Sequence, residues 1–460
     1  MQTSASPGPE ESMSPGRQFL RALARRFPRA RKAYLWIAAR ARHYLGRVWR
    51  GLRKIGSSVS WVWQLMAALH RHRQDPRLTV AVDVAAFWEP LTGIGWYLYR
   101  LLENLSTRED LSIQMFSPSI IRSPDLDGPA VELPTGPSLE LLGYEIPPEK
   151  VLFAGTVTRL LRRLEPLLIA AHGSDVLFAP NYFLPRRFTL ARGGLVATIH
   201  DVGLREVPWT LRDETLQELS DRLDQTLEKA SHLITVSGAV KEELLRHGYP
   251  DSDRIHVIHH GPGQLSTVTA GELPGNVPER FALHVGTLEP RKNIEVLLAC
   301  WRELHQRLPD APTLLLCGKY GWKTKAIQRG VESGEKAGWL QHLGYVEEMQ
   351  LAALYEQAQV VIFPSLYEGF GLPAVEALWA GTPLVCSDLP VLREVAGKGA
   401  LFAPADRPDL LAAAVVRILE DAALRENLIR EGRRHIQELS WQRAADETVA
   451  VWRLAHDRQD

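Results

Sequence analysis

The sequence predicts an α/β protein with two Rossmann-like, doubly wound domains that face each other across a cleft, preceded by a basic helical extension. Three observations lead to this prediction. After Pro76, short β-branched runs alternate with longer segments of helical period, which is typical of βαβ units and a parallel sheet. Residues 261–278, rich in Gly, Pro, Ser and Thr, interrupt this alternation and indicate a linker between domains. The first 77 residues hold 16 Lys or Arg but only 3 Asp or Glu, which sets them apart from the rest of the chain.

Length and composition fit this organisation. The chain has 460 residues, of which 45% are hydrophobic, and this is enough for two cores of ordinary size. We therefore assign residues 1–77 to the extension, residues 78–265 to the first domain, residues 280–439 to the second domain and residues 440–460 to a C-terminal helix.

The same composition argues against several kinds of partner. The formal net charge is zero, which argues against nucleic acid. The cysteines Cys300, Cys317 and Cys386 lie in apolar runs without metal-binding spacing, so the sequence suggests neither disulfides nor a zinc site. No apolar stretch approaches the roughly 18 residues that a membrane helix needs, and no secretory signal is visible. We expect a cytoplasmic protein, at most peripheral at the inner face of the membrane.

The basic extension contains amphipathic helical patterns. Within residues 44–55, apolar side chains such as Leu45 and Trp49 fall on one side of a helix, and arginines such as Arg50 fall on the other. An Arg-rich face opposite an aromatic one suits an anionic membrane, so we predict that residues 17–70 bind such a surface. Three alternatives remain: the helices pack on the protein itself, the segment is a solvated basic arm, or it is an organellar transit peptide.

In the first domain, candidate site residues follow the expected strands. In doubly wound sheets, ligands bind beyond the carboxyl ends of the strands. After the first strand, a TGIG sequence with Gly93 and Gly95 opens a helix, and another strand ends at the pair His200 and Asp201. An imidazole there can donate or accept a proton, although a capped structural histidine is the alternative. Ser237 is expected to cap a further helix. The expected strands are residues 78–87, 111–117, 175–180, 195–200, 232–237 and 255–260.

The second domain carries positive side chains after its strands. Its first strand ends at Gly286, and a charged turn with Arg291 and Lys292 leads into a helix. Two cations at a strand's carboxyl end could neutralise a diphosphate, whereas a solvated Arg-Lys pair is the alternative. The next strand is followed by Gly318 and Lys319. The expected strands are residues 281–286, 313–318, 360–365 and 383–388.

The strongest signal is FPSLYEGFGLPAVEALWAGTPLVCSD, which covers residues 363–388. A buried strand ends there, a glycine-rich turn follows, and Pro373 stands where a first helical residue is favoured. Free backbone N–H groups and the positive dipole end at such a helix terminus bind phosphate. Glu368 on the turn and Glu376 on the helix bracket this position.

These motifs resemble those of the retaining glycosyltransferases of family four, also called glycosyl transferases group 1, whose fold is the two-domain GT-B type. The resemblance spans about residues 78–460. It implies that Glu368 holds hydroxyls of the transferred sugar, that Glu376 holds the ribose, and that Lys292 and Arg291 support the diphosphate leaving group. Residues 440–460 look like the helices that in this fold cross back to the first domain.

The resemblance also implies roles for residues elsewhere in the cleft. His200 is expected to contact the transferred sugar, whereas Asp201 and Trp96 are expected on the acceptor side. Two positions depart from the family pattern, because Thr287 and Trp96 stand where many members carry Arg. The donor-binding residues implied by the resemblance are Glu376, Gly369, Phe370, Gly371, Leu372, Lys319, Gly93, Gly95 and Gly286.

The expected reaction moves a sugar from a nucleoside diphosphate to a hydroxyl of a glycan or lipid-linked acceptor, with retention of configuration. The GTLEPRKN string and the His-Asp pair look most like bacterial mannosyltransferases of surface polysaccharides, which implies GDP-mannose as donor. No cofactor or metal is expected, because Arg and Lys take the place of Mg²⁺ and the two DxD strings, beginning at Asp125 and Asp251, lie away from strand ends. Three alternatives are a UDP-sugar donor, an epimerase of the same fold, and a catalytically silent membrane adaptor.

Overall fold

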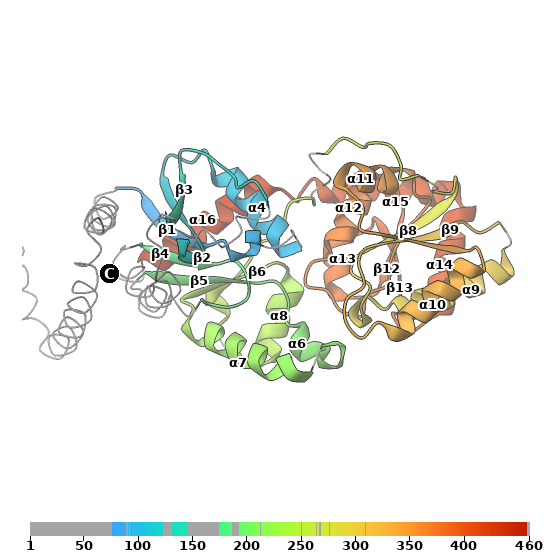
Figure 1. The fold of residues 1–460 in the computed structure, drawn as a ribbon, viewed down its shortest axis with the longest axis horizontal. Helices are drawn as coiled ribbons and strands as arrows, with labels where there is room; N and C mark the ends of the chain where they lie inside the picture. Colours follow the sequence, from blue (N-terminus) through green and yellow to red (C-terminus); the bar gives the residue numbers. More distant parts are fainter. Residues whose placement is uncertain are drawn as a thin grey trace, which may run out of the picture. The chain divides into compact units, whose positions relative to one another are not determined.

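The computed structural model describes residues 76–457 apart from residues 89–90, 92, 123–130, 146–173, 186–192, 212, 250, 264, 266–267, 276 and 309. The described residues form two sheets, one of seven strands and one of six, and every strand pairing in them is parallel (Figure 1). The membrane-binding prediction for residues 17–70 and the DxD string at Asp125 lie outside the described residues.

The first sheet has the order β3-β2-β1-β4-β5-β6-β7. The order reverses between β1 and β4, which is the switch point at which doubly wound domains bind ligands. The strands are β1 (Leu78–Asp83), β2 (Leu111–Arg122), β3 (Leu139–Glu145), β4 (Val176–Ala179), β5 (Gly194–Ile199), β6 (His232–Thr235) and β7 (Ile255–Val257). The helices are η1 (Ala85–Trp88), α4 (Gly93–Leu105), α6 (Gly203–Glu206), η4 (Pro208–Thr210), α7 (Asp213–Lys229), α8 (Gly238–Arg246) and η5 (Ser252–Arg254).

The second sheet has the order β10-β9-β8-β11-β12-β13, with the same kind of reversal between β8 and β11. Its strands are β8 (Phe281–Val285), β9 (Thr313–Cys317), β10 (Leu340–Gly344), β11 (Val361–Phe363), β12 (Leu384–Ser387) and β13 (Ala400–Ala403). Its helices are η7 (Pro290–Lys292), α9 (Ile294–Arg307), α10 (Lys325–Lys336), α11 (Glu348–Gln357), α12 (Leu372–Ala380), α13 (Pro390–Ala396), α14 (Pro408–Glu420) and α15 (Ala422–Ile436).

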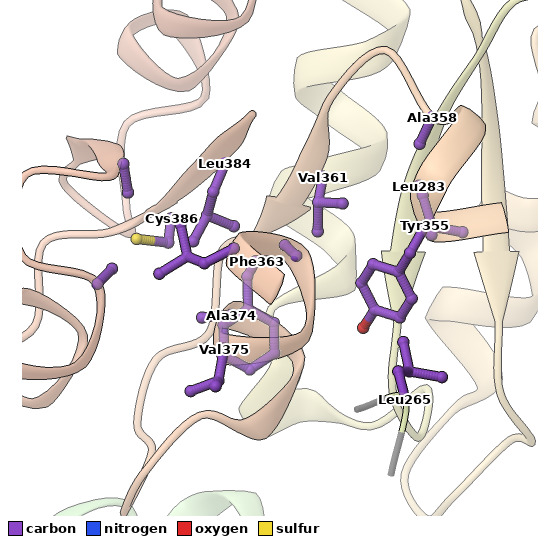
Figure 2. Packing of buried hydrophobic residues seen from close by; sticks show 14 of the residues in the cluster. Leu265, Leu283, Tyr355, Ala358, Val361, Phe363, Ala374, Val375, Leu384 and Cys386 are labelled. Carbon is purple, nitrogen blue, oxygen red and sulfur yellow. The ribbon is translucent and has the colours of Figure 1, made fainter. Parts of the chain in front are cut away.

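The central strands of the second sheet are mostly apolar on both faces, because helices cover both. Leu283 packs in one hydrophobic cluster with α11, α12 and α13, whereas its neighbour Ala282 packs in another with α9, α10 and α14. Successive strand residues point to opposite faces, so a sheet buried on both sides requires continuous apolar runs. Figure 2 shows the first cluster, with Phe363 of β11 beside Ala374 and Val375 of α12.

The C-terminal helix α16 (Trp441–Asp457) packs on the first sheet although it follows the second in sequence (Figure 1). The Trp452 ring lies edge-on to Phe178 of β4, with ring centroids 5.2 Å apart. Gly194 at the start of β5 lies against the backbone of Ala455, where a Cβ would come closer than 3.0 Å. The second domain is therefore joined to the first by two chain segments, the one after β7 and the one before α16.

The predicted fold class is confirmed, but three strands were missed. These are β3, β10 and β13, and each lies at the edge of its sheet. Polar residues interrupt the apolar runs of β3 (LELLGYE) and β10 (LQHLG), whereas β13 (ALFA) is a run of only four residues, so all three give a weak signal. The first strand was also predicted too long. It ends at Asp83, whose carboxylate accepts the Ala85 N–H (3.1 Å), and a 3₁₀ turn follows.

Candidate functional site

A buried group of opposite charges lies where β8 and β11 end. Lys292 Nζ donates to Glu368 Oε1 at 2.6 Å, and Arg291 donates to Glu368 Oε2 at 3.2 Å. Lys292 and Glu368 are each only 7% exposed. The sequence predicted all three residues as site residues, and the structure brings them together from two separate turns.

Backbone geometry explains why the two turns meet. Asn293 ends η7 in the left-handed region (φ 58°), which asparagine tolerates better than most residues. Its side-chain amide donates to the Pro364 carbonyl (3.0 Å) and to the Ala405 carbonyl (2.6 Å). The Leu366 N–H donates to the Arg291 carbonyl (2.9 Å). The turn with the cations is therefore tied to the turn with Glu368.

The charges in this group hold one another in the ionised state. Burial alone would raise the pKa of Glu368, but Lys292 and Arg291 hold it below its usual value. Burial lowers the pKa of Lys292, and the Glu368 carboxylate opposes this effect. Burial would also lower the pKa of Arg291, but Glu368 and Asp201 outweigh it and raise the pKa. The site thus offers preformed cations to an anionic ligand.

Glu289 is a second carboxylate of this group that the sequence analysis did not single out. It is 2% exposed, and Arg291 Nε donates to its Oε1 at 3.1 Å. Burial raises its pKa, whereas Arg291 and Lys292 lower it. Arg291 therefore lies between Glu289 and Glu368, which fixes its direction. Glu289 lies within the GTLEPRKN sequence, two residues before Arg291. That position could have identified it as a site residue from the sequence.

His200 lies at the carboxyl end of β5, as predicted, and is buried. Its Nε2 is 2.7 Å from the Pro180 carbonyl oxygen, which can only accept, so Nε2 carries the proton and Nδ1 is left with a lone pair. Burial lowers the pKa of His200 to about 4, so the ring is neutral at physiological pH. A neutral imidazole here can accept a hydrogen bond from a ligand hydroxyl.

Asp201 is joined by a residue that the sequence analysis missed. Tyr182, just beyond β4, donates its hydroxyl to Asp201 Oδ2 at 2.6 Å, and the Gly203 N–H donates to Asp201 Oδ1 at 2.9 Å. Tyr182 has φ 49°, a rare conformation for a tyrosine. Burial raises its pKa well above the usual value, as do the charges of Asp201 and Glu368. The first domain therefore adds a polar pair that acts electrostatically on the charged group of the second.

The glycine-rich turn before α12 fits against the first domain. Gly371 is the N-cap of α12 at φ 94°, a region that favours glycine. Phe370 packs on His260, with ring centroids 4.7 Å apart. Ser237 caps α8 by accepting the Val240 N–H, as expected, and also donates to the Gly369 carbonyl at 2.7 Å. The turn is thus placed by both domains.

Glu376 lies on the first turns of α12 and is buried. The Tyr355 hydroxyl donates to Glu376 Oε2 at 2.9 Å, and Gly263 leaves the room that the carboxylate occupies, since a Cβ there would collide with it. Burial raises the pKa of Glu376 to about 7, an effect that the Tyr355 hydrogen bond reduces. Glu376 therefore titrates near neutral pH.

Other predicted donor-binding residues are glycines, whose part in the structure lies in their backbone. Gly286 and Gly318 end β8 and β9 at φ 148° and φ 141°, and a Cβ on Gly318 would collide with the Gly286 carbonyl. Gly93 and Gly95 lie inside the first turn of α4 and not in a loop before it. A Cβ on Gly93 would be 3.7 Å from Leu372 of α12, so this helix start faces the second domain.

Two predicted residues point elsewhere. Lys319 is exposed and its Nζ lies 5.2 Å from the centre of the Tyr345 ring, on which it packs as a cation on an aromatic face. Trp96 lies on α4 in edge contact with Tyr99, with centroids 5.8 Å apart, and Arg100 lies over its ring. Neither contact involves Lys292 or Glu368, and the acceptor-side role of Trp96 stays a prediction.

The described part of the chain offers neither a metal site nor a membrane-spanning helix. No cluster of three or more His, Cys, Asp or Glu residues there could hold a metal ion. No helix there is long and apolar enough to cross a bilayer.

The charged group of Lys292, Arg291, Glu368 and Glu289 can bind an anion through its two cations and hydroxyl groups through Glu368. This chemistry suits a phosphorylated sugar.

Comparisons with known proteins cover both domains. The family model "Glycosyl transferases group 1" matches residues 271–435, and "Glycosyltransferase Family 4" matches residues 91–261. The O-antigen chain mannosyltransferase B of Escherichia coli is 30% identical over 394 residues, which cover 79% of this chain and 97% of that protein. A phosphatidyl-myo-inositol mannosyltransferase of Mycolicibacterium smegmatis is 29% identical over 340 residues, covering 70% of this chain and 84% of that protein.

Among solved structures, a sucrose-phosphate synthase from Thermosynechococcus elongatus superposes with a TM-score of 0.63 and 24% identity, covering 83% of this chain and 100% of the other. WaaG, a glycosyltransferase of lipopolysaccharide biosynthesis, superposes with a TM-score of 0.57 and 14% identity, covering 81% and 99%. At these identities the likeness concerns the fold, which is the two-domain GT-B type.

Proposed function

This chain belongs to the glycosyl transferases of group 1 and family four, and from that premise we propose that it transfers mannose from GDP-mannose to a hydroxyl of a glycan or lipid-linked acceptor, with retention of configuration. The observation that carries the proposal is the buried Lys292–Glu368 pair with Arg291 beside it. Mannose is favoured because a mannosyltransferase of O-antigen chains matches along 97% of its own length.

The proposed mechanism uses the charged group twice. When the donor binds, its diphosphate oxygens compete with Glu368 for Lys292 and Arg291, and sugar hydroxyls donate to the carboxylate that is released. As the glycosidic bond of the donor breaks, negative charge grows on the leaving phosphate. Cations already in place stabilise that charge without reorganisation. This role is one that a metal ion has in other transferases, so we propose that the reaction needs none.

The acceptor hydroxyl attacks from the face that the leaving group vacates, which gives retention. The leaving phosphate takes the hydroxyl proton, and no enzyme nucleophile takes part. His200 is neutral because burial lowers its pKa to about 4, so it contributes a hydrogen-bond acceptor and not a positive charge. Asp201 and Tyr182, joined at 2.6 Å, are proposed to line the acceptor side.

A donor screen tests this proposal. Thermal unfolding should be shifted more by GDP-mannose than by UDP- or ADP-sugars, because a ligand that binds the native state stabilises it. NMR of the first product should then show that an α-configured donor gives an α-linkage. The rate of transfer should be the same with and without EDTA. If only UDP-sugars stabilise the protein against thermal unfolding, the donor is a UDP-sugar and not GDP-mannose. An inverted product or loss of activity with EDTA would overturn the mechanism, and no turnover with any nucleotide sugar would favour a silent adaptor.

Donor affinity is expected to rise with pH through Glu376. Burial raises its pKa to about 7, so part of the population is protonated near neutrality. Ribose hydroxyls that donate to the carboxylate favour its ionised form, so binding releases a proton and tightens as pH rises from about 6 to about 8. The diphosphate of a nucleotide sugar stays ionised over this range. Calorimetric titrations at several pH values should give this slope, and Glu376→Gln should remove it. An equal slope in both proteins would contradict the assignment.

We also propose that residues 17–70 bind an anionic membrane and bring the site to a lipid-linked acceptor. Each Lys or Arg near anionic lipid contributes about 1 kcal/mol, and salt screens that attraction. The full chain should therefore sediment with anionic vesicles at low salt and less at high salt, whereas a truncated chain that begins at Asp75 should stay in solution. Equal sedimentation of the two chains would instead assign this segment to packing on the protein or to a leader.

A further inference from the structure

Tyr367 directly precedes Glu368 in the turn between β11 and α12, yet its side chain lies in the other domain. Its ring belongs to the hydrophobic cluster of the first domain that includes Val202, Leu223 and Leu244, and only 6% of the residue is exposed. Gly203 provides the space, because a Cβ there would stand 3.1 Å from the tyrosine ring. A second-domain residue thus completes a first-domain core.

The Tyr367 hydroxyl makes two hydrogen bonds inside that core. It accepts the N–H of Val202 at 2.8 Å and donates to Glu243 Oε2 of α8 at 2.6 Å. Val202 follows Asp201 in sequence, so the hydroxyl is anchored beside the His200 and Asp201 pair. Hydrogen bonds to a carboxyl in a buried setting are short and directional, so they fix the position of the ring.

The backbone on either side of Glu368 is fixed as well. The Tyr367 carbonyl accepts from Arg291 at 3.2 Å, and the Gly369 carbonyl accepts from Ser237 of the first domain at 2.7 Å. Glu368 therefore lies between two residues held by the first domain, while its own side chain pairs with Lys292 of the second. Its location depends on contact between the two domains.

We propose that Tyr367 is a positioning residue whose hydroxyl docks the Glu368 turn on the first domain, so that Glu368 reaches the transferred sugar only when that contact is made. The proposal rests on the proposed function of Glu368. It adds that catalysis is coupled to domain contact through Val202 and Glu243, neither of which needs to touch the substrate. Misplacement of a reacting group by about 1 Å can cost about a hundredfold in rate.

The kinetic test compares two tyrosines. Tyr367→Phe keeps the ring and removes the hydroxyl, so we expect kcat to fall roughly 10- to 100-fold while the donor KM changes less than about threefold. Tyr249→Phe is the matched control, because that hydroxyl donates to Asp224 and accepts from Arg205 within the first domain. It should keep kcat. Glu243→Ala removes the acceptor of the Tyr367 hydroxyl and should lower kcat. Glu243→Gln keeps an acceptor oxygen and should retain most of the activity.

An exchange measurement tests the docking without activity. The Val202 amide should exchange with solvent deuterium faster in Tyr367→Phe than in the wild type or in Tyr249→Phe, because it loses its acceptor. Unchanged kcat in Tyr367→Phe overturns the proposal, and so does a lower kcat with unchanged Val202 exchange. If the wild-type protein transfers no sugar, the proposed function fails, while Val202 exchange still reports whether Tyr367 docks the turn.

Discussion

Lys292→Ala and Glu368→Ala are each expected to lower kcat about a hundredfold to a thousandfold, because each removes a group proposed to act on charge or orientation in the transition state. Losses of about 2–4 kcal/mol are usual for such contacts. Both variants should fold. Without Lys292, Glu368 keeps Arg291 as partner, and without Glu368, Arg291 keeps Glu289 while burial favours a neutral Lys292. Initial rates of transfer and circular dichroism measure the two effects.

Lys398→Ala serves as the control, because this lysine is exposed and lies on the loop between α13 and β13, away from the charged group. It should retain the wild-type rate. Lys319→Ala should also retain most of it, since that side chain packs on Tyr345. Near wild-type turnover in both Lys292→Ala and Glu368→Ala would end the assignment of the site. A large loss in Lys319→Ala would show that this lysine reaches the donor in the complex.

The site residues that the sequence predicted are those that lie in short local sequence motifs. Lys292 and Glu368 each stand just after a buried strand of the second sheet, and parallel strands end at a common edge, so their proximity followed from the fold class. The pairing at 2.6 Å did not follow, because it depends on Asn293 tying the two turns together. Burial then decides the protonation of His200 and Glu376, and burial is a property of the packed structure.

The site residues that the sequence did not predict make their contacts with residues that are distant in sequence. Tyr182 follows a predicted strand, so the rule of searching beyond strand ends could have found it, but its bond to Asp201 joins two strands of the first sheet. Tyr367 was part of the strongest string, yet nothing local indicates that its ring belongs to the other domain's core. Lys319 shows the converse. It has the right position after a strand, but an exposed side chain is free to pack on Tyr345.

Gly369 is a position at which the second domain approaches the first closely, because its carbonyl accepts from Ser237 of the first domain at 2.7 Å. A Cβ on this residue would approach the His200 carbonyl and the Asp201 Cβ to less than 3.0 Å, a separation that real Cβ atoms do not show. Both neighbours are held by the end of β5, where His200 is bonded to the Pro180 carbonyl and Asp201 to Tyr182. Neither can move aside as the end of a flexible side chain would.

Gly369→Ala is therefore expected to push the Glu368 turn away from the first domain and to lower kcat by about a hundredfold or more, because displacement of a positioned group by about 1 Å has effects of that size. The added methyl should cost only about 1–3 kcal/mol of stability, since each domain can keep its own core. Gly275→Ala is the matched control, because no atom lies within 4 Å of a Cβ there. Rates and thermal unfolding of both variants give the comparison. If Gly369→Ala keeps wild-type kcat, contact between this turn and the end of β5 is not needed for transfer, and the coupling of Glu368 to the first domain must be abandoned.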